Sequence, residues 1–134
     1  MGYYTYFNLS VADSIENAKL GIDTVPSEVQ REMAKTLYTE VLDWYSDEYK
    51  NKIIKDLDYE MDPLNYEFCG DSIKWYDHDD DMLELSRRYP NYYFILDGSG
   101  EERGDDWIAY YHNGKHQLCR AQITYDAPST LYLD

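Results

Sequence analysis

The dipeptide Asn113-Gly114 constrains the fold more strongly than any other feature of this sequence. A two-residue type I′ turn places both of its central residues at positive φ, and Asn followed by Gly accepts this conformation readily. Residues 107–111 and 115–125, on either side of the dipeptide, carry aromatic and apolar side chains that strands favour. The sequence therefore predicts an antiparallel β-hairpin in this region.

Four other stretches have the pattern of strands. Residues 3–11 alternate their side chains with a period of two, and residues 92–96 (YYFIL) form a continuous apolar run. Residues 66–68 and 73–76 are shorter, and the turn-forming segment 69–72 separates them. We therefore expect four strands in addition to the hairpin.

Two segments have the pattern of helices. The first begins at Ser27, where Gln30 completes the spacing of a capping box. It runs on or begins again near Ser46, and Asp62-Pro63 ends the helical region. Its apolar stripe has a spacing of four residues and consists of Val29, Met33, Leu37 and Val41. The second helix begins after Asp77, a favourable N-cap residue, and ends before Pro90.

The order of these elements predicts the fold class. Strand, helix, strand, strand, helix, strand is the βαββαβ order of the ferredoxin-like fold, to which the C-terminal hairpin is added. We expect an α+β protein with its helices on one face of a mainly antiparallel sheet. The length of 134 residues suits a single domain over residues 1–134, and a hydrophobic content of 43% is enough for a core.

The chain is strongly acidic. Lys and Arg total 12, Asp and Glu total 27, and the formal net charge is −15. Such a surface repels phosphate groups, which argues against direct binding of DNA or RNA and favours a basic protein as partner. The 16 tyrosines fit two interpretations, because tyrosine favours strands and is also enriched at protein interfaces.

The acidic residues are densest in two runs, one at the start of the second helix and one in a glycine-rich loop predicted over residues 97–106. In the predicted topology both runs lie at one edge of the sheet, about 10 Å apart, because two parallel strands end there. We predict that they form one partner-binding surface. Its candidate residues are Asp77, Asp79, Asp80, Asp81, Asp97, Glu101, Glu102, Asp105 and Asp106.

Three interpretations of these carboxylates stay open. They are the capping of a helix together with a solvated turn, a site for a divalent cation, and a surface that docks on a basic groove of another protein. The loop lacks the spacing of a calcium-binding loop, which weighs against the second interpretation. We expect no metal ion or other cofactor at this surface.

A zinc site is the alternative that the His and Cys residues offer. In the predicted hairpin, His112 and Cys119 share one face about 13 Å apart, and His116 lies on the opposite face. A zinc ion with bonds of about 2 Å does not reach all three. Cys69 and His78 would join one of them only through tertiary contacts, and we expect both cysteines to be buried thiols.

No catalytic motif is recognisable in the sequence. Neither cysteine has a neighbouring His in a nucleophile arrangement, and the motifs G-x-S-x-G and H-E-x-x-H do not occur. No stretch approaches the ~20 apolar residues that cross a bilayer, and the first residues lack the pattern of a secretory leader. We therefore expect a non-enzymatic, cytoplasmic protein.

The patterns KWYDHxxDM, LSxxYP, GxGEE and GDxW begin at Lys74, Leu85, Gly98 and Gly104. Through these patterns, residues 70–114 resemble a family of small proteins of phages and mobile elements. The family is similar to ferredoxin-like domains, so the resemblance implies that fold.

The resemblance also implies a function. Some small acidic phage proteins are anti-CRISPR inhibitors, which suggests a protein that docks on a basic CRISPR effector nuclease of the host and blocks nucleic-acid binding. A zinc- or divalent-metal-binding protein is the first alternative. A phage accessory domain without a nuclease target is the second.

Overall fold

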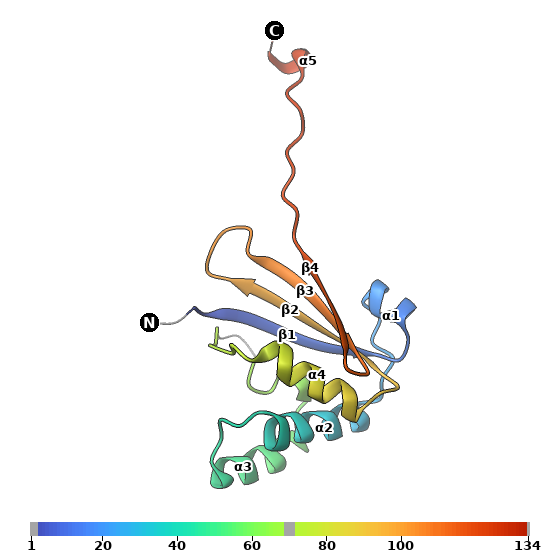
Figure 1. Cartoon of the computed structure of the whole chain (residues 1–134), viewed down its shortest axis with the longest axis vertical. Helices are drawn as coiled ribbons and strands as arrows, with labels where there is room; N and C mark the ends of the chain where they lie inside the picture. Colours follow the sequence, from blue (N-terminus) through green and yellow to red (C-terminus); the bar gives the residue numbers. More distant parts are fainter. Residues whose placement is uncertain (1–2, 69–71, 134) are drawn as a thin grey trace.

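The computed structural model describes residues 3–68 and 72–133 and has an α+β fold (Figure 1). Four antiparallel strands form one open sheet in the order β1-β2-β3-β4. The strands are β1 (Thr5–Ala12), β2 (Tyr93–Gly100), β3 (Asp106–His112) and β4 (Lys115–Arg120). None of the helices in the described residues has the length and apolar character needed to span a membrane.

The hairpin between β3 and β4 forms as the sequence predicts. Asn113 and Gly114 both have positive φ, 46° and 76°, and His112 pairs with Lys115. β4 is shorter than predicted, because its pairing with β3 ends at Arg120. Residues 121–129 have no regular structure, and the short helix α5 (Thr130–Leu133) follows them.

Most helical segments lie in the chain between β1 and β2. They are α1 (Ile15–Leu20), α2 (Ser27–Thr36), the π-helical turn η1 (Leu37–Val41), α3 (Asp47–Leu57), the 3-10 turn η2 (Pro63–Asn65) and α4 (His78–Arg88). The helix does begin again after Ser46, whose hydroxyl accepts a hydrogen bond from the Tyr49 N–H at 3.2 Å. The predicted capping box is wrong, because the Gln30 side chain donates instead to the Asp23 carboxylate and the Val25 carbonyl.

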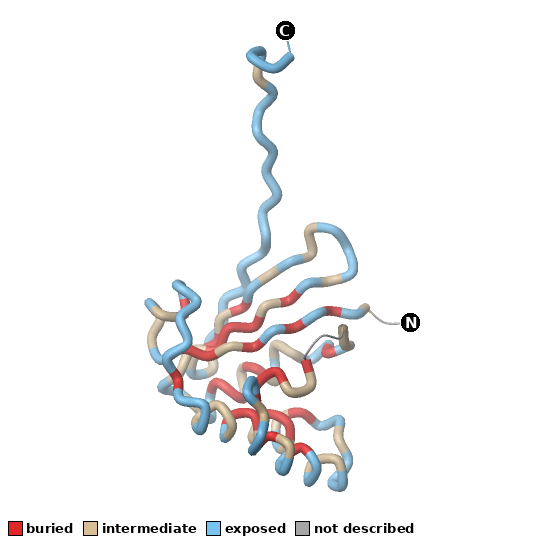
Figure 2. Tube along the Cα trace, turned by 180° about the vertical axis from the view of Figure 1, so that it is seen from behind, coloured by how far each residue is buried: buried red, intermediate tan, exposed pale blue. Residues whose placement is uncertain are grey.

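One face of the sheet and the three longer helices enclose the main core. α2, α3 and α4 lie on this inner face, and the buried residues are concentrated between them and the sheet (Figure 2). The large, fully buried side chains of this core include Leu9, Met33, Leu37, Tyr38, Ile53, Leu57, Met82, Leu85, Phe94 and Tyr111. The predicted placement of the helices on one face of the sheet is not confirmed, because α1 packs on the outer face through Ala18 and Ile95.

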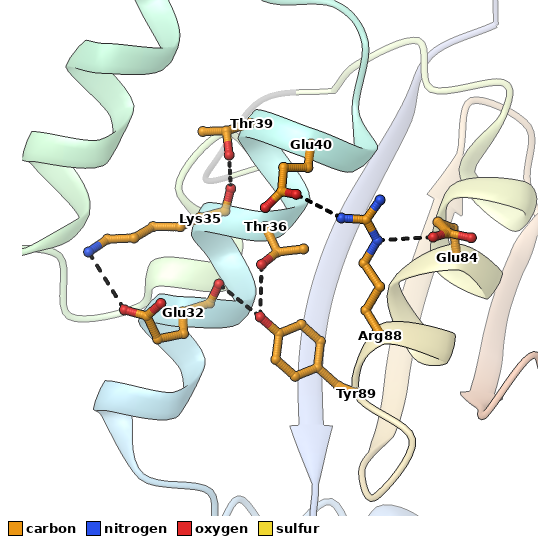
Figure 3. A network of polar contacts seen from close by, with 8 residues as sticks. All are labelled: Glu32, Lys35, Thr36, Thr39, Glu40, Glu84, Arg88 and Tyr89. Atoms are coloured by element: carbon orange, nitrogen blue, oxygen red, sulfur yellow. Dashed lines mark hydrogen bonds and ion pairs between the residues drawn. The ribbon is translucent and has the colours of Figure 1, made fainter.

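A polar network joins α2 and η1 to α4 (Figure 3). The Arg88 guanidinium contacts the Glu40 carboxylate at 3.0 Å and the Glu84 carboxylate at 2.9 Å. The Tyr89 hydroxyl lies 2.8 Å from the Thr36 hydroxyl. Because the ion pairs are exposed to solvent, each contributes only about 0–1 kcal/mol to the stability of the fold.

Asn65 and Ile73 close the free edge of β1. The Asn65 side chain accepts a hydrogen bond from the Leu9 N–H at 2.7 Å and donates one to the Leu9 carbonyl at 2.8 Å. Further along the same edge, Thr5 and Ile73 exchange two backbone hydrogen bonds of 2.9 Å. Asn65 is buried, so its amide replaces water as the partner of the Leu9 backbone.

The ferredoxin-like arrangement is not confirmed. β1 pairs only with β2 in the sheet, so it does not lie between two parallel strands. The predicted strand at residues 66–68 is replaced by turns after η2, and the one at residues 73–76 is reduced to the bridge at Ile73. Asn65 already occupies part of the β1 edge where such a strand would add. Residues 69–71 of the predicted turn lie outside the described residues.

Replacement of Asn65 by Ala should destabilise the fold strongly. The Leu9 N–H and carbonyl would both lose a buried partner, at about 1–3 kcal/mol each, so we expect the free energy of unfolding to fall by about 2–6 kcal/mol. Urea denaturation followed by circular dichroism measures this loss. Asn51→Ala, at an exposed position of α3, is the matched control and should change the free energy by less than about 0.5 kcal/mol. Equal effects of the two substitutions would contradict the role of Asn65.

Candidate functional site

The first acidic run opens α4. Asp77 stands at the N-cap position, as predicted, but its side chain makes no capping hydrogen bond. Asp79, Asp80 and Asp81 occupy the first turn, where the positive end of the helix dipole stabilises negative charge. Asp77 and Asp80 are exposed, whereas Asp79 and Asp81 are half-buried. The run therefore consists of two outward and two inward carboxylates.

The two inward carboxylates bond within the fold. Asp81 accepts a hydrogen bond from Trp75 Nε1 at 2.8 Å, and burial raises the pKa of this carboxyl group. Asp79 accepts a hydrogen bond from the Tyr111 hydroxyl at 2.8 Å and lies 3.0 Å from His116 Nδ1. Burial by itself would raise the pKa of Asp79, but the hydrogen bonds from His116 and Tyr111 together lower it below its ordinary value.

The second acidic run forms the loop between β2 and β3. This loop begins at Glu101, later than predicted, because β2 continues through Gly100. Glycine is required inside β2, since a Cβ atom at Gly98 would clash with the indole ring of Trp107. Asp97 was expected in the loop, but it lies within β2 and faces the outer side of the sheet. Asp97 is therefore separated from the other acidic residues of this run.

Tyr3 joins the loop to the segment that precedes α4. Its hydroxyl donates a hydrogen bond to the Asp105 carboxylate and accepts one from the Glu102 N–H at 3.2 Å. Its backbone N–H donates to the Tyr76 hydroxyl at 2.8 Å. The two acidic runs therefore lie at the same end of the sheet, although a different topology from the predicted one brings them together.

A small cavity of about 210 Å³ lies between the two runs. Its lining residues are Tyr3, Thr5, Trp75, Tyr76, His78, Asp105 and Trp107. His78 stacks on Trp107 with their ring centroids 5.0 Å apart. Burial lowers the pKa of His78, and its buried Nδ1 has no hydrogen-bond partner among the described residues. At neutral pH the imidazole is therefore uncharged and leaves the neighbouring carboxylates unneutralised.

Exposed tyrosines surround the acidic residues. Tyr4 is 41% exposed and Tyr76 is 64% exposed. The Tyr4 N–H donates to the Glu101 carboxylate at 3.2 Å, and the ammonium group of Lys74 lies 4.7 Å from the centre of the Tyr4 ring. We call this region the acidic end. Its residues are Tyr3, Tyr4, Tyr76, Asp77, Asp80, Glu101, Glu102, Asp105 and Asp106.

The remaining His and Cys residues are dispersed. His112 and Cys119 share the outer face of the sheet, and His116 lies on the inner face, as predicted. Within residues 3–68 and 72–133, no three His, Cys, Asp or Glu side chains are close enough to hold a metal ion. Cys119 is exposed, so the prediction of a buried thiol is wrong there, and Cys69 lies outside the described residues.

Sequence reasoning missed the role of Tyr3. It contacts Tyr76 and Asp105, which lie 73 and 102 positions away, and no local pattern predicts hydrogen bonds across such separations. The sequence features that could have indicated such a contact are Gly98 and Gly100, because glycine inside a strand often marks the close approach of another group. At Gly100 the neighbouring groups are the Tyr3 hydroxyl and the Asp105 carboxylate.

Comparison with known proteins identifies no relative. No family model, curated protein or solved structure matches this chain. Its function is therefore inferred from the geometry and charge of the acidic end, together with the sequence pattern of residues 70–114.

Asparagine substitutions at the two inward carboxylates should have opposite effects at neutral pH. Asp79→Asn removes a carboxylate whose pKa the fold lowers, so it should reduce the free energy of unfolding by about 1 kcal/mol. Asp81→Asn removes a charge that burial disfavours and keeps an acceptor for Trp75 Nε1, so it should leave the free energy equal or slightly higher. Urea denaturation of both variants measures the two effects.

The pH dependence follows from the direction of each pKa shift. The stabilisation from Asp79 is present above its unfolded pKa of about 3.9 and is lost as the pH falls through its lower folded pKa. Ionised Asp81 disfavours the folded state as the pH rises through its unfolded and then its higher folded pKa. The difference between the two variants should therefore shrink in strong acid, and an unchanged difference would contradict these roles.

Proposed function

We propose that this chain is a non-enzymatic binding protein that docks its acidic end on a basic, nucleic-acid-binding protein and thereby blocks nucleic-acid binding. The observation that carries the proposal is the convergence of two acidic segments, from α4 and from the β2–β3 loop, around exposed tyrosines. Carboxylates arranged in this way present the same sign of charge as the phosphates of a nucleic acid.

Hydrogen bonds fix the acidic end before a partner binds. Tyr3 bonds to both acidic segments, Glu101 accepts from the Tyr4 N–H, and the Ser99 hydroxyl donates to Asp106 at 2.6 Å. Groups that are already ordered lose less conformational entropy on binding. The exposed tyrosine rings add contact area of the kind that protein interfaces favour.

The charge of the whole chain favours the same class of partner. A net charge of −15 repels acidic proteins and nucleic acids and accelerates the approach of a basic surface. The acidic end would then occupy a groove that otherwise holds nucleic acid. Such competition needs no cofactor and no catalytic residue.

The resemblance of residues 70–114 to small phage proteins suggests the identity of the partner. On this basis we propose a CRISPR effector nuclease in the cytoplasm of a host cell. A nuclease of this type holds its guide and target strands in a positively charged channel, which is the kind of groove an acidic protein fits.

Neutralisation of the exposed carboxylates should weaken binding to such a nuclease. The test variant carries Asp77→Asn, Asp80→Asn, Glu101→Gln and Glu102→Gln. These changes remove four charges from the proposed contact, so we expect the dissociation constant at low salt to rise about tenfold or more, which corresponds to about 1.4 kcal/mol. Isothermal titration calorimetry with the purified nuclease measures the change.

A control variant makes the same change of net charge elsewhere. It carries Glu28→Gln, Asp43→Asn, Asp47→Asn and Glu48→Gln, all of which are exposed. This variant should weaken binding by less than about threefold, because it alters only the long-range attraction. Equal losses in the two variants would show attraction by charge without a defined surface, contrary to the proposal.

Binding should also weaken steadily as the salt concentration rises. Salt screens the attraction between exposed charges, so the dissociation constant of the unmodified protein should increase from low to high salt. Titrations over a salt series measure this dependence. An affinity that stays constant over the series would rule out mimicry of nucleic-acid charge.

A further inference from the structure

The two free edges of the sheet differ. On β1, Thr5 pairs with Ile73 and Leu9 bonds to Asn65, so this edge has no continuous row of free backbone groups. On β4 all six residues are exposed, and no backbone group in the described part of the chain bonds to its outer edge. An open edge of this kind is a template for pairing with another strand.

The register of the hairpin shows which groups of β4 face outward. The Ala121 N–H continues the pairing and donates to the Asp106 carbonyl at 2.8 Å. Because bonding alternates along an antiparallel strand, the odd-numbered residues of β4 bond to β3. The backbone groups of His116, Leu118 and Arg120 therefore point away from the sheet.

The segment that follows β4 has the pattern of a strand, but on its outer side it has no backbone partner among residues 3–68 and 72–133. Ala121, Ile123 and Tyr125 alternate with polar residues, and Ile123 and Tyr125 are 55% and 79% exposed. Figures 1 and 2 show this tail standing away from the body of the protein. Pro128 ends the pattern, since proline has no N–H to donate. The backbone and the apolar side chains of this segment are therefore available for pairing with another strand.

We propose that two copies of this chain pair through their β4 edges, antiparallel about a twofold axis, to form one continuous sheet. The backbone N–H and C=O groups that point outward belong to even-numbered residues. Hydrogen bonds between the two copies therefore require even-numbered residues of one copy to face even-numbered residues of the other. The residue on the twofold axis faces the same residue of the other copy. If Arg120 lay on the axis, two guanidinium groups would face each other, and like charges disfavour that pairing. A register centred on Ala121 avoids this repulsion and is the one we assign to the dimer.

In this register the tail of each copy pairs with β4 of the other. The facing pairs are Leu118 with Thr124, Cys119 with Ile123, Arg120 with Gln122, and His116 with Asp126. No pair joins like charges, and Asp126 brings a carboxylate to a strand whose charged side chains are basic. The pairing ends where Pro128 of one copy faces the turn residue Gly114 of the other.

The net charge sets the salt dependence of this dimer. Each copy carries −15, so the two copies repel each other, and salt screens this repulsion. Salt should therefore strengthen the dimer, whereas it should weaken the docking of the acidic end on a basic protein. The dimer and the proposed function can thus fail separately.

Sedimentation velocity of the full chain tests the dimer. The unmodified protein should change from monomer to dimer as its concentration rises, and more readily at high salt. Thr124→Pro removes an N–H that the dimer uses and that bonds to no backbone group in the described part of the free chain, so this variant should stay monomeric with an unchanged circular dichroism spectrum. Ser129→Pro lies beyond the paired segment and should dimerise normally. A monomer at every concentration, or dimerisation of Thr124→Pro, would overturn the proposal.

A disulfide bond tests the register. Residue 119 and residue 123 of the other copy would form a non-hydrogen-bonded pair with Cα atoms about 4.5 Å apart, within the range of a disulfide. On oxidation Ile123→Cys should give a covalent dimer whose bond joins positions 119 and 123 by mass spectrometry. Thr124→Cys places its thiol on the opposite face and should not link to Cys119. Linking in the second variant and not in the first would contradict this register.

Discussion

The two backbone hydrogen bonds between Thr5 and Ile73 fix the position of the segment that leads into α4. They hold the segment before α4 along the edge of β1, so that Trp75 packs into the core and Asp77 emerges where the β2–β3 loop turns. Tyr3 continues from β1 and bonds to both segments. Acidic residues that are distant in the sequence therefore form one end of the molecule.

The carboxylates at this end have different environments and different roles. Asp79 and Asp81 receive hydrogen bonds from inside the fold and set the position of α4 against the sheet. Asp77 and Asp80 remain exposed beside the loop, where a partner would reach them. Hydrogen bonding to the inward groups offsets part of the repulsion that a cluster of like charges creates. The charged side chains of the β4 edge are basic, and the dimer that we propose there has the reverse dependence on salt.

Local chemistry made part of this structure predictable from the sequence. The asparagine-glycine turn and the limits of α4 depend on neighbouring residues, and they were predicted correctly. The start of α3 after Ser46 was one of two alternatives that the sequence left open. Residues 66–68 and 73–76 have the composition of strands, but pairing depends on what occupies the β1 edge, and Asn65 already does. Gly98 suggested a loop because glycine favours turns, whereas Trp107 requires it inside β2. The acidic runs were visible in the sequence, but their attachment through Tyr3 was not.

Hydrogen exchange in a complex with the basic partner tests the central claim most directly. Docking through the acidic end predicts that the backbone amides of residues 3–4, 76–81 and 101–106 exchange more slowly on binding, while those of α3 do not change. Slower exchange confined to α3, with no change at the acidic end, would contradict the proposed mode of binding.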